Sequence, residues 1–271
     1  MSFRSHSDSL GFYPASVPMT IPRPVLAGLL SLILLPSPLP AAEKPAARDS
    51  RALALLQRMS QTLAAAPAFT YDATSMVEVP ARTGQFLTLF SRADVALKRP
   101  DKLRAFFRGE APAFDFFYNG RTVTAFAPAT KVYSVTKAPA TIDAMLPGLE
   151  EKTGVRFATA PLLVSDPYRA LTTGLTSAVV VGTTTVRGVS CQHLALRSTG
   201  VNWEIWIESG SRALPRRLAV TFTDRTGFPR TVVEFSRWNL NPWLRESDFE
   251  FRKPSGATEI PYQAVLKSAG R

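Results

Sequence analysis

Cys191 and His193 are the residues whose types and spacing could support catalysis. Cys191 is the only cysteine, and His193 is the only histidine beyond residue 6. Two residues apart on a strand, they would point to one face, where a thiol and an imidazole can act as nucleophile and base. No third group that would orient the imidazole is evident. We therefore favour a contact of His193 with Trp206 on the next strand, beside an inert thiol.

Other residue types exclude several kinds of site. One histidine beyond residue 6 is too few for a metal site built from several histidines. Asp143, Glu150, Glu151 and Asp166 fall in one predicted helical segment, where caps and solvated faces account for them. The sequence contains neither a phosphate-binding glycine loop nor a nucleophile elbow. We expect no catalytic residues, no metal and no cofactor.

The remaining signal is apolar and lies on predicted hairpins. Asn119-Gly120 predicts a two-residue turn that pairs Tyr118 with Arg121 and sets Phe116 opposite Val123. A turn at 198–201 would likewise set His193 opposite Trp206 and place the aliphatic residues of both strands on the other face. The candidate ligand groove consists of these inward residues: Phe114, Phe116, Val123, Ala125, Leu194, Leu196, Trp203, Ile205 and Phe222. The same faces would suit a packed core, and both alternatives stay open.

Two groups of short strands must position these residues. About six strands are predicted between residues 69 and 136, and the second group is predicted at 178–185, 189–197, 202–208, 215–224 and 230–239, with a possible last strand at 249–251. Because the turns are short, neighbouring strands should be antiparallel. We expect a mainly β (α+β) fold, a curved antiparallel sheet of about eleven strands, which the family resemblance given below implies is an incomplete barrel. An N-terminal helix ending near Ala65 and a helical insert would close it.

The insert at 141–176 is predicted to act as a lid over one mouth of the sheet. Its apolar residues recur at helical spacing in two helices, at 141–152 and 166–176. Asp166-Pro167 is typical of a helix start, with a cap followed by proline. The predicted lid residues are Ile142, Met145, Leu146, Leu149, Tyr168, Leu171 and Leu175.

The N-terminal region predicts export. The apolar run at 25–35 follows Arg23 and ends in prolines before Ala41-Ala42, the pattern of a signal peptide. It is shorter than the roughly 20 residues that span a bilayer, although a retained anchor is the alternative. We expect residues 1–42 to form the signal region, with Met19 as a possible true start. Residues 43–271 would then form a single periplasmic domain.

The charge balance suggests a class of partner. The formal net charge is +11. Such a charge favours contact with an anionic membrane surface or another polyanion. The alternative is that the charge only keeps the protein in solution. The basic residues are scattered without a run of five, so we expect no nucleic-acid partner.

Three segments carry a family resemblance. Residues 188–222 (GVSCQHLALRSTGVNWEIWIESGSRALPRRLAVTF), 228–242 (FPRTVVEFSRWNLNP) and 249–260 (FEFRKPSGATEI) resemble the predicted periplasmic proteins grouped as domain of unknown function 2092. That family is similar in fold to the lipoprotein carriers LolA and LolB and to the regulator RseB. The resemblance implies an incomplete barrel whose helices close an apolar cavity. It transfers no catalytic residue.

These observations lead to three hypotheses about function. The first is a non-catalytic periplasmic binding or carrier protein for a lipid, an acyl chain or a lipoprotein-like hydrophobic ligand. The alternative is an envelope-stress or protein-interaction module of the RseB kind that binds a peptide or lipoprotein. An enzyme on the same fold is a weaker alternative, because a fold alone does not decide activity.

Overall fold

The computed structural model describes residues 48–110, 113–153 and 157–261. The chain divides into two units, Met1–Ala42 and Glu43–Arg271, and every described residue belongs to the second. The predicted signal region, its cleavage position and the possible start at Met19 therefore lie outside the described residues.

One helix and six strands come first, followed by the insert and the second strand group. The first part contains α1 (Ser50–Ala65), β1 (Ala68–Pro80), β2 (Phe86–Lys98), β3 (Lys102–Gly109), β4 (Phe114–Tyr118), β5 (Thr122–Ala127) and β6 (Val132–Lys137). The insert contains α2 (Ile142–Thr153), α3 (Ala160–Leu163) and α4 (Pro167–Thr172). The last part contains β7 (Leu175–Val186), β8 (Val189–Ser198), β9 (Val201–Glu208), β10 (Pro215–Phe222), β11 (Arg230–Asn239), the 3₁₀ helix η1 (Glu246–Phe249) and β12 (Thr258–Glu259).

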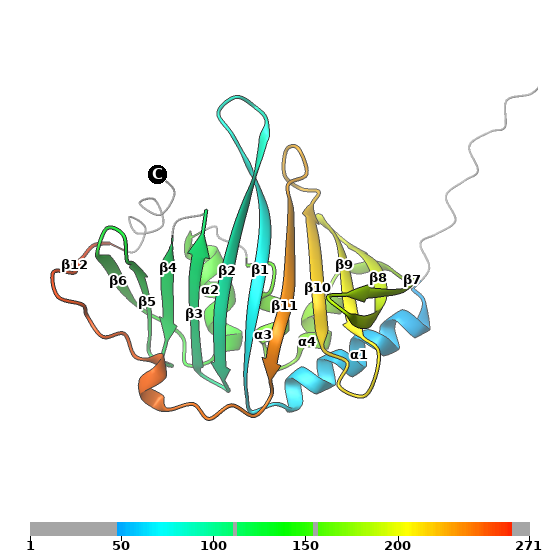
Figure 1. The fold of residues 1–271 in the computed structure, drawn as a ribbon, viewed down its shortest axis with the longest axis horizontal. Coiled ribbons are helices and arrows are strands. Elements are labelled where there is room, and N and C mark those ends of the chain that lie inside the picture. Colours follow the sequence, from blue (N-terminus) through cyan, green and yellow to red (C-terminus); the bar gives the residue numbers. More distant parts are fainter. Residues whose placement is uncertain (1–47, 111–112, 154–156, 262–271) are drawn as a thin grey trace, which may run out of the picture. The chain divides into compact units, whose positions relative to one another are not determined.

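The strands form one unclosed sheet made of two meanders (Figure 1). The order is β12-β6-β5-β4-β3-β2-β1-β11-β10-β9-β8-β7, so the two meanders meet where β1 pairs with β11. This arrangement confirms the predicted mainly β, incomplete barrel. The described sheet has twelve strands, one more than expected, and β12 runs parallel to β6. The prediction of a possible last strand at 249–251 was wrong, because Phe249 ends the 3₁₀ helix η1.

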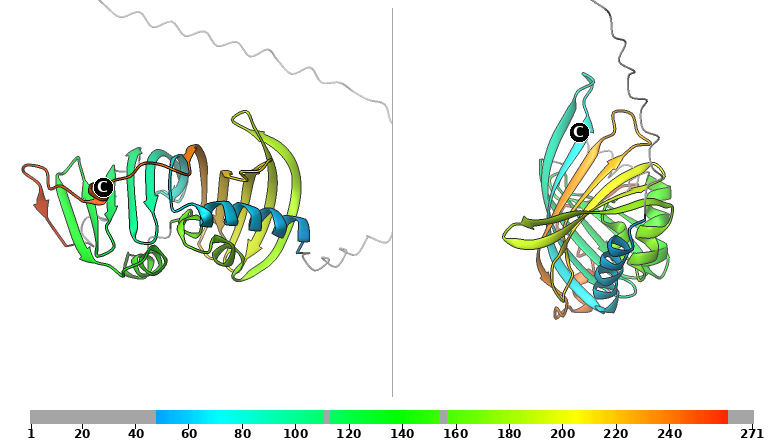
Figure 2. Two further views of the ribbon diagram at one scale, coloured as in Figure 1. Left: turned by 90° about the horizontal axis from the view of Figure 1, so that it is seen from below. Right: turned by 90° about the vertical axis from the view of Figure 1, so that its right-hand side faces the viewer.

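The α-helices α1 to α4 lie on one face of the curved sheet (Figure 2). We call this face the inner face and the opposite one the outer face. On β10, Leu218, Val220 and Phe222 join the main apolar cluster of the inner face, whereas Ala219 packs in a separate outer cluster. This period of two follows from the pleat of a strand. Helix α1 contributes Leu56, Met59 and Leu63 to the inner cluster, as their helical spacing predicts.

The β4–β5 hairpin keeps the predicted faces but not the predicted register. Tyr118 pairs with Val123 instead of Arg121. The Asn119 side-chain oxygen accepts hydrogen bonds from the backbone nitrogens of Arg121 at 3.1 Å and Thr122 at 3.0 Å, which moves the turn on by one residue. The partners therefore shift by two positions. A shift of two leaves every side chain on its own face.

The β8–β9 hairpin has the predicted register. Arg197 pairs with Asn202, and His193 pairs with Trp206. Leu194 and Trp203 lie in the inner cluster, as expected.

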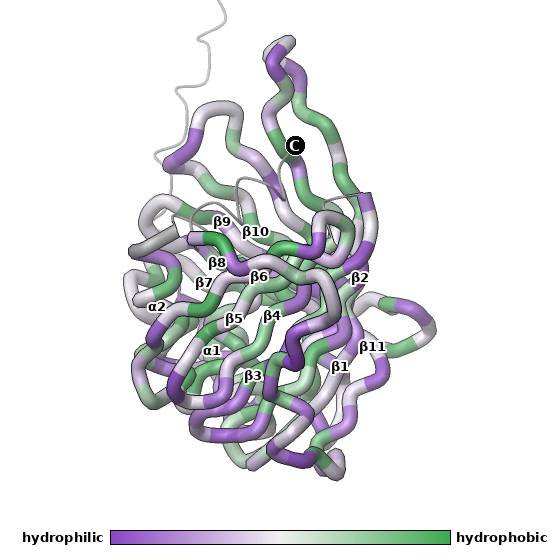
Figure 3. The backbone as a smooth tube through the Cα atoms, turned by 90° about the vertical axis from the view of Figure 1, so that its left-hand side faces the viewer, coloured by the Kyte–Doolittle hydropathy of each residue, from purple (hydrophilic) through white to green (hydrophobic). Residues whose placement is uncertain are grey.

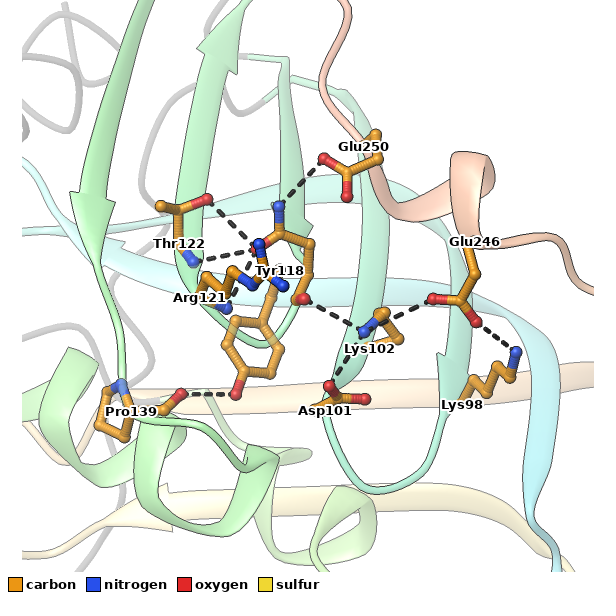
Figure 4. A network of polar contacts seen from close by, with 10 residues as sticks. Lys98, Asp101, Lys102, Tyr118, Arg121, Thr122, Pro139, Glu246 and Glu250 are labelled. Carbon is orange, nitrogen blue, oxygen red and sulfur yellow. Dashed lines mark hydrogen bonds and ion pairs between the residues drawn. The ribbon is translucent and has the colours of Figure 1, made fainter.

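The C-terminal segment is bonded to the ends of the first meander (Figure 4). On η1, Glu246 contacts Lys98 Nζ at 2.5 Å and Lys102 Nζ at 3.5 Å. Further along, Glu250 accepts a hydrogen bond from the Asn119 amide at 3.0 Å. These polar contacts hold the C-terminal segment against the turns that follow β2 and β4.

Candidate functional site

A cavity of about 490 Å³ lies between the insert helices and the strands β8–β10. Of the eighteen residues that line it, Glu150 is the only one with a charged side chain. The lining residues are Leu146, Pro147, Glu150, Phe157, Ala158, Ala160, Pro161, Val164, Ala170, Leu171, Thr173, Ser198, Thr199, Val201, Trp203, Leu218, Val220 and Phe222. Such a volume falls within the roughly 300–1,000 Å³ of typical small-molecule sites.

The sheet wall of the cavity comes from inward positions of two paired strands. Trp203 lies on β9 and pairs with Val220 on β10, and Leu218 and Phe222 lie two residues to either side. Because alternate residues share a face, strand formation alone brings these four side chains together. All four are buried.

The helical wall is short and is held by polar contacts behind it. Asp143 on α2 accepts a hydrogen bond from the Ser165 backbone nitrogen at 2.9 Å, and its other oxygen accepts one from the Ser165 hydroxyl. The Arg99 guanidinium donates to the carbonyl oxygens of Leu163 at 3.0 Å and Leu63 at 3.3 Å. Arg99 thereby ties the end of α3 to the end of α1. The three insert helices are thus held in place by side chains that do not line the cavity.

Polar groups gather at one end of the cavity. Ser198 and Thr199 belong to the β8–β9 turn, and Ser198 Oγ accepts from Trp203 Nε1 at 3.4 Å. Thr173 caps α4, two residues before Leu175, which pairs with Ser198. The cavity is therefore amphipathic, with hydroxyl groups at the turn and an apolar interior.

A second, smaller hollow of about 40 Å³ lies over the inner face of the first meander. Leu146 and Phe157 line both spaces. The other residues around the smaller one are Tyr71, Val95, Leu103, Ala105, Phe107, Phe116, Thr159 and Leu163. Phe157 therefore lies at the boundary between the cavity and an apolar extension.

A family model described as predicted periplasmic protein (DUF2092) matches residues 52–263. The chain belongs to this family. No curated protein matches the sequence significantly.

Solved structures similar to this DUF2092 member share little sequence with it. An uncharacterised conserved protein from Thermus thermophilus is 15% identical, covers 78% of this chain and 99% of its own, and has a TM-score of 0.45. Lipoprotein LppX of Mycobacterium tuberculosis is 15% identical over 70% of this chain and 96% of its own, with a TM-score of 0.45. A LolA superfamily protein from Nitrosomonas europaea is 11% identical over 74% and 97%, with a TM-score of 0.38. MucB is also among these neighbours. Likenesses this distant carry no argument about a ligand.

The predicted groove residues fall into four places in this DUF2092 protein. Trp203 and Phe222 line the cavity, and Phe116 lines the smaller hollow. The main core holds Val123, Leu194, Leu196 and Ile205, with Phe114 half-buried against it. Ala125 lies in a separate small cluster beside Ala127. The structure therefore places most of the predicted groove in solid packing.

The predicted lid residues are similarly divided. Leu146 and Leu171 line the cavity. Ile142, Met145 and Leu149 are buried in the core, and Tyr168 packs against it. Leu175 was wrongly assigned to a lid helix, because α4 ends at Thr172 and Leu175 begins β7. Gly174, at a φ of +69°, provides the left-handed turn between the two elements.

Sequence reasoning missed several cavity residues. Leu218 and Val220 lie four and two residues before Phe222 on β10 and therefore share its face. The strand period could thus have pointed to both residues. The segment from Phe157 to Val164 supplies five further apolar lining residues. Its apolar run was a weaker signal, since a four-residue helix such as α3 is too short to show a helical period.

Cys191 and His193 lie on the outer face, away from the cavity. Burial raises the pKa of the Cys191 thiol, although Arg216 acts in the opposite direction, and Cys191 packs against Trp206 in an apolar cluster. The His193 ring stacks on Trp206 with centroids 4.1 Å apart, and its Nε2 lies 2.9 Å from Glu204 Oε2. A carboxylate therefore does orient this imidazole, contrary to the sequence analysis. The raised thiol pKa nevertheless disfavours the reactive thiolate.

A more polar hollow of about 370 Å³ lies between the outer face and the C-terminal segment. Arg104, Arg245 and Arg252 line it together with an equal number of acidic residues, so its charges balance. Within residues 48–110, 113–153 and 157–261, no cluster of three or more His, Cys, Asp or Glu side chains is suited to hold a metal ion. In the same ranges, no helix is both long and apolar enough to cross a membrane.

Proposed function

We propose that this DUF2092 protein is a non-catalytic periplasmic binding or carrier protein that holds one acyl chain, or a similarly slender lipid-like group, in the 490 Å³ cavity. The observation that carries the proposal is the composition of the cavity wall. Fourteen of its eighteen lining residues are apolar, and they come from both the sheet and the helices. A site of this kind gains affinity by removing apolar ligand surface from water.

The amphipathic cavity also supports an orientation for the ligand. Ser198 and Thr199 lie at the turn end, whereas Phe157 lies beside the apolar extension. An acyl chain would point toward Phe157, and its polar head group would remain near the hydroxyl groups. Because no basic residue lines the cavity, the chain rather than a charged head group would supply most of the binding energy.

The same lining argues against the two alternative functions. An extended peptide carries a hydrogen-bonding N–H and C=O at almost every residue, and burying these groups unpaired is costly. Only Glu150, Thr173, Ser198 and Thr199 offer polar side chains. The lining contains no cysteine, histidine or lysine, and Ser198 Oγ accepts a hydrogen bond from Trp203 Nε1, whereas His193 lies on the outer face. These features favour an acyl ligand over a peptide, and binding over catalysis.

Native mass spectrometry of protein purified from the periplasm tests the proposal directly. We expect a co-purifying species with the mass of a fatty acid or lipid, released under denaturing conditions. A mass equal to that of the polypeptide alone, together with no uptake of a fluorescent fatty acid, would refute it.

A cavity-filling variant locates the ligand. Val220→Phe adds volume to the sheet wall and should abolish fatty-acid uptake while the protein stays folded. Ala125→Phe is the matched control, because Ala125 is buried on the same face but outside the cavity. Overpacking there should cost roughly 1–3 kcal/mol and leave uptake per folded molecule unchanged. Equal loss of uptake in both variants would argue against this site.

A further inference from the structure

The hairpin formed by β1 and β2 extends beyond the rest of the sheet (Figure 1). β1 pairs with β11 only as far as Val77, and β2 pairs with β3 only from Ser91 onward. Between these limits the two strands pair only with each other, from Glu78 with Thr88 to Pro80 with Phe86. The outer part of the hairpin therefore has no neighbouring strand on either side among the described residues.

This projecting part is apolar on both faces, and Figure 3 shows hydrophobic stretches along it. On this part and at its base, the side chains of Val77, Val79, Leu87 and Leu89 point to one face, and those of Met76, Phe86 and Phe90 point to the other, where Glu78 and Thr88 also lie. None of these seven side chains belongs to an apolar cluster of the described core. Leu87 is 43% exposed and Phe90 52%. Core packing therefore does not explain the composition of the hairpin.

The loop between β10 and β11 adds to the same apolar surface. Phe228 in this loop is 59% exposed. Gly227 lies so close to the Phe86 ring that a Cβ there would clash with it, so the loop and the hairpin are in contact. We call Leu87, Phe90 and Phe228, with the strands and loop that carry them, the apolar tip.

The charges around the apolar tip are of both signs, because Asp224 precedes Arg225 in the loop and Glu110 accepts a hydrogen bond from the Phe90 backbone nitrogen at 2.7 Å. Arg82 is the only charged residue from 79 to 91, and it is exposed. The Arg225 guanidinium lies 4.6 Å from the ring of Phe222, which lines the cavity. Glu78 instead accepts a hydrogen bond from the Arg230 backbone nitrogen at 2.8 Å. The outermost charge of the hairpin is thus Arg82, and the chain as a whole carries a net charge of +11, which would attract it to an anionic surface.

We propose that the apolar tip docks on an anionic lipid membrane, with Leu87, Phe90 and Phe228 at head-group depth and Arg82 and Arg225 against the phosphates. A partner that docks on one face of the hairpin would leave the other apolar face in water, whereas a lipid interface surrounds both faces. The unpaired backbone edges limit insertion to the hydrated interface, because they would be unsatisfied in hydrocarbon.

The docking surface lies at the end of the sheet where the cavity has its polar groups. The backbone nitrogen of Thr223, at the start of the β10–β11 loop, donates to the carbonyl oxygen of Gly200 in the β8–β9 turn at 3.0 Å. Ser198 and Thr199 precede Gly200 in that turn. A membrane at the apolar tip would therefore lie beside the polar end of the cavity.

Vesicle flotation tests the docking surface. Wild-type protein should float with vesicles of phosphatidylethanolamine and phosphatidylglycerol and less with vesicles of phosphatidylcholine. The double variant Leu87→Ser, Phe90→Ser should bind the anionic vesicles at least roughly tenfold more weakly, with an unchanged melting temperature. Arg82→Gln with Arg225→Gln should reduce binding to the anionic vesicles alone.

Trp243→Ser is the matched control. Trp243 is the most exposed large apolar residue of the described chain, at 81%, and follows the opposite end of β11. It should float like the wild type. Wild-type protein that stays in solution, equal flotation of the Leu87/Phe90 variant, or a dimer that this variant dissociates would overturn the proposal. Fatty-acid uptake from solution should persist in the Leu87/Phe90 variant, so failure of docking and failure of the cavity proposal are distinguishable.

Discussion

His193 and Cys191 have different partners although they share a strand and a face. The imidazole stacks on Trp206 and bonds Glu204, which the Arg230 guanidinium also contacts at 2.5 Å. The thiol donates to the Val189 carbonyl oxygen at 3.4 Å. These contacts describe an outer surface held together by stacking and charge pairing, on the side of the sheet opposite the cavity.

We predict that His193→Ala lowers the free energy of unfolding by about 1–2 kcal/mol, through loss of the ring stack and one hydrogen bond. Fatty-acid uptake should not change. Urea unfolding and an uptake assay on the same preparation check both parts. Lost uptake at wild-type stability would instead support the thiol–imidazole hypothesis.

Phe157 is the residue that, under the proposed function, would limit how far an acyl chain reaches into the molecule. Its side chain is half-buried and borders both the cavity and the smaller hollow. We predict that Phe157→Ala joins the two spaces and shifts preference toward longer fatty acids, measured by competition between short- and long-chain probes. The stability cost should be below the roughly 3–5 kcal/mol of a fully buried phenylalanine. An unchanged chain-length preference would mean that the ligand does not approach Phe157.

The stability of the short insert helices α3 and α4 depends on their contacts with the rest of the fold, because neither helix is long enough to be stable alone. α3 has four residues and α4 has six, too short to be stable alone in water. Asp143 and Arg99 supply the bonds that hold them against α2 and α1. The helical wall of the cavity should therefore open more readily than the sheet.

We predict that Asp143→Ala speeds amide hydrogen exchange in residues 160–172 and accelerates ligand release. The loss of stability should be about 1–3 kcal/mol, because Asp143→Ala removes two hydrogen bonds and each typically contributes roughly 0.5–1.5 kcal/mol. Asp143→Asn keeps an acceptor for the Ser165 nitrogen and should lie between this variant and the wild type. If exchange in the sheet rises as much as in the insert, Asp143 acts on the whole fold and not on the wall.

At the largest scale, the described part of the chain is built on one unclosed sheet whose two meanders join at a single strand pair, β1 with β11. The family description as periplasmic agrees with the export signal expected ahead of it. We predict that N-terminal sequencing of the mature protein starts close to Ala42. A protein that retained residues before Val25 would contradict cleavage and favour the anchor alternative.

Local sequence patterns predicted the antiparallel sheet and its helices, but not the pairing of β1 with β11 or the parallel strand β12. Alternating apolar residues and short turns predicted the antiparallel strands, and the helical period located α1 and α2. The registers differ in how well they were predicted. That of β8–β9 followed from its turn, whereas that of β4–β5 moved by two because one side-chain oxygen, on Asn119, accepts hydrogen bonds from the turn backbone.

The division between cavity and core was decided only by tertiary structure. Leu194 and Trp203 both lie on the inner face of adjacent strands, yet Trp203 borders open space and Leu194 is packed solid. Periodicity assigns a side chain to a face. Whether space remains in front of that side chain depends on which distant helix covers it. Here the segments α2, α3 and α4 leave the region between Phe157 and Phe222 unfilled.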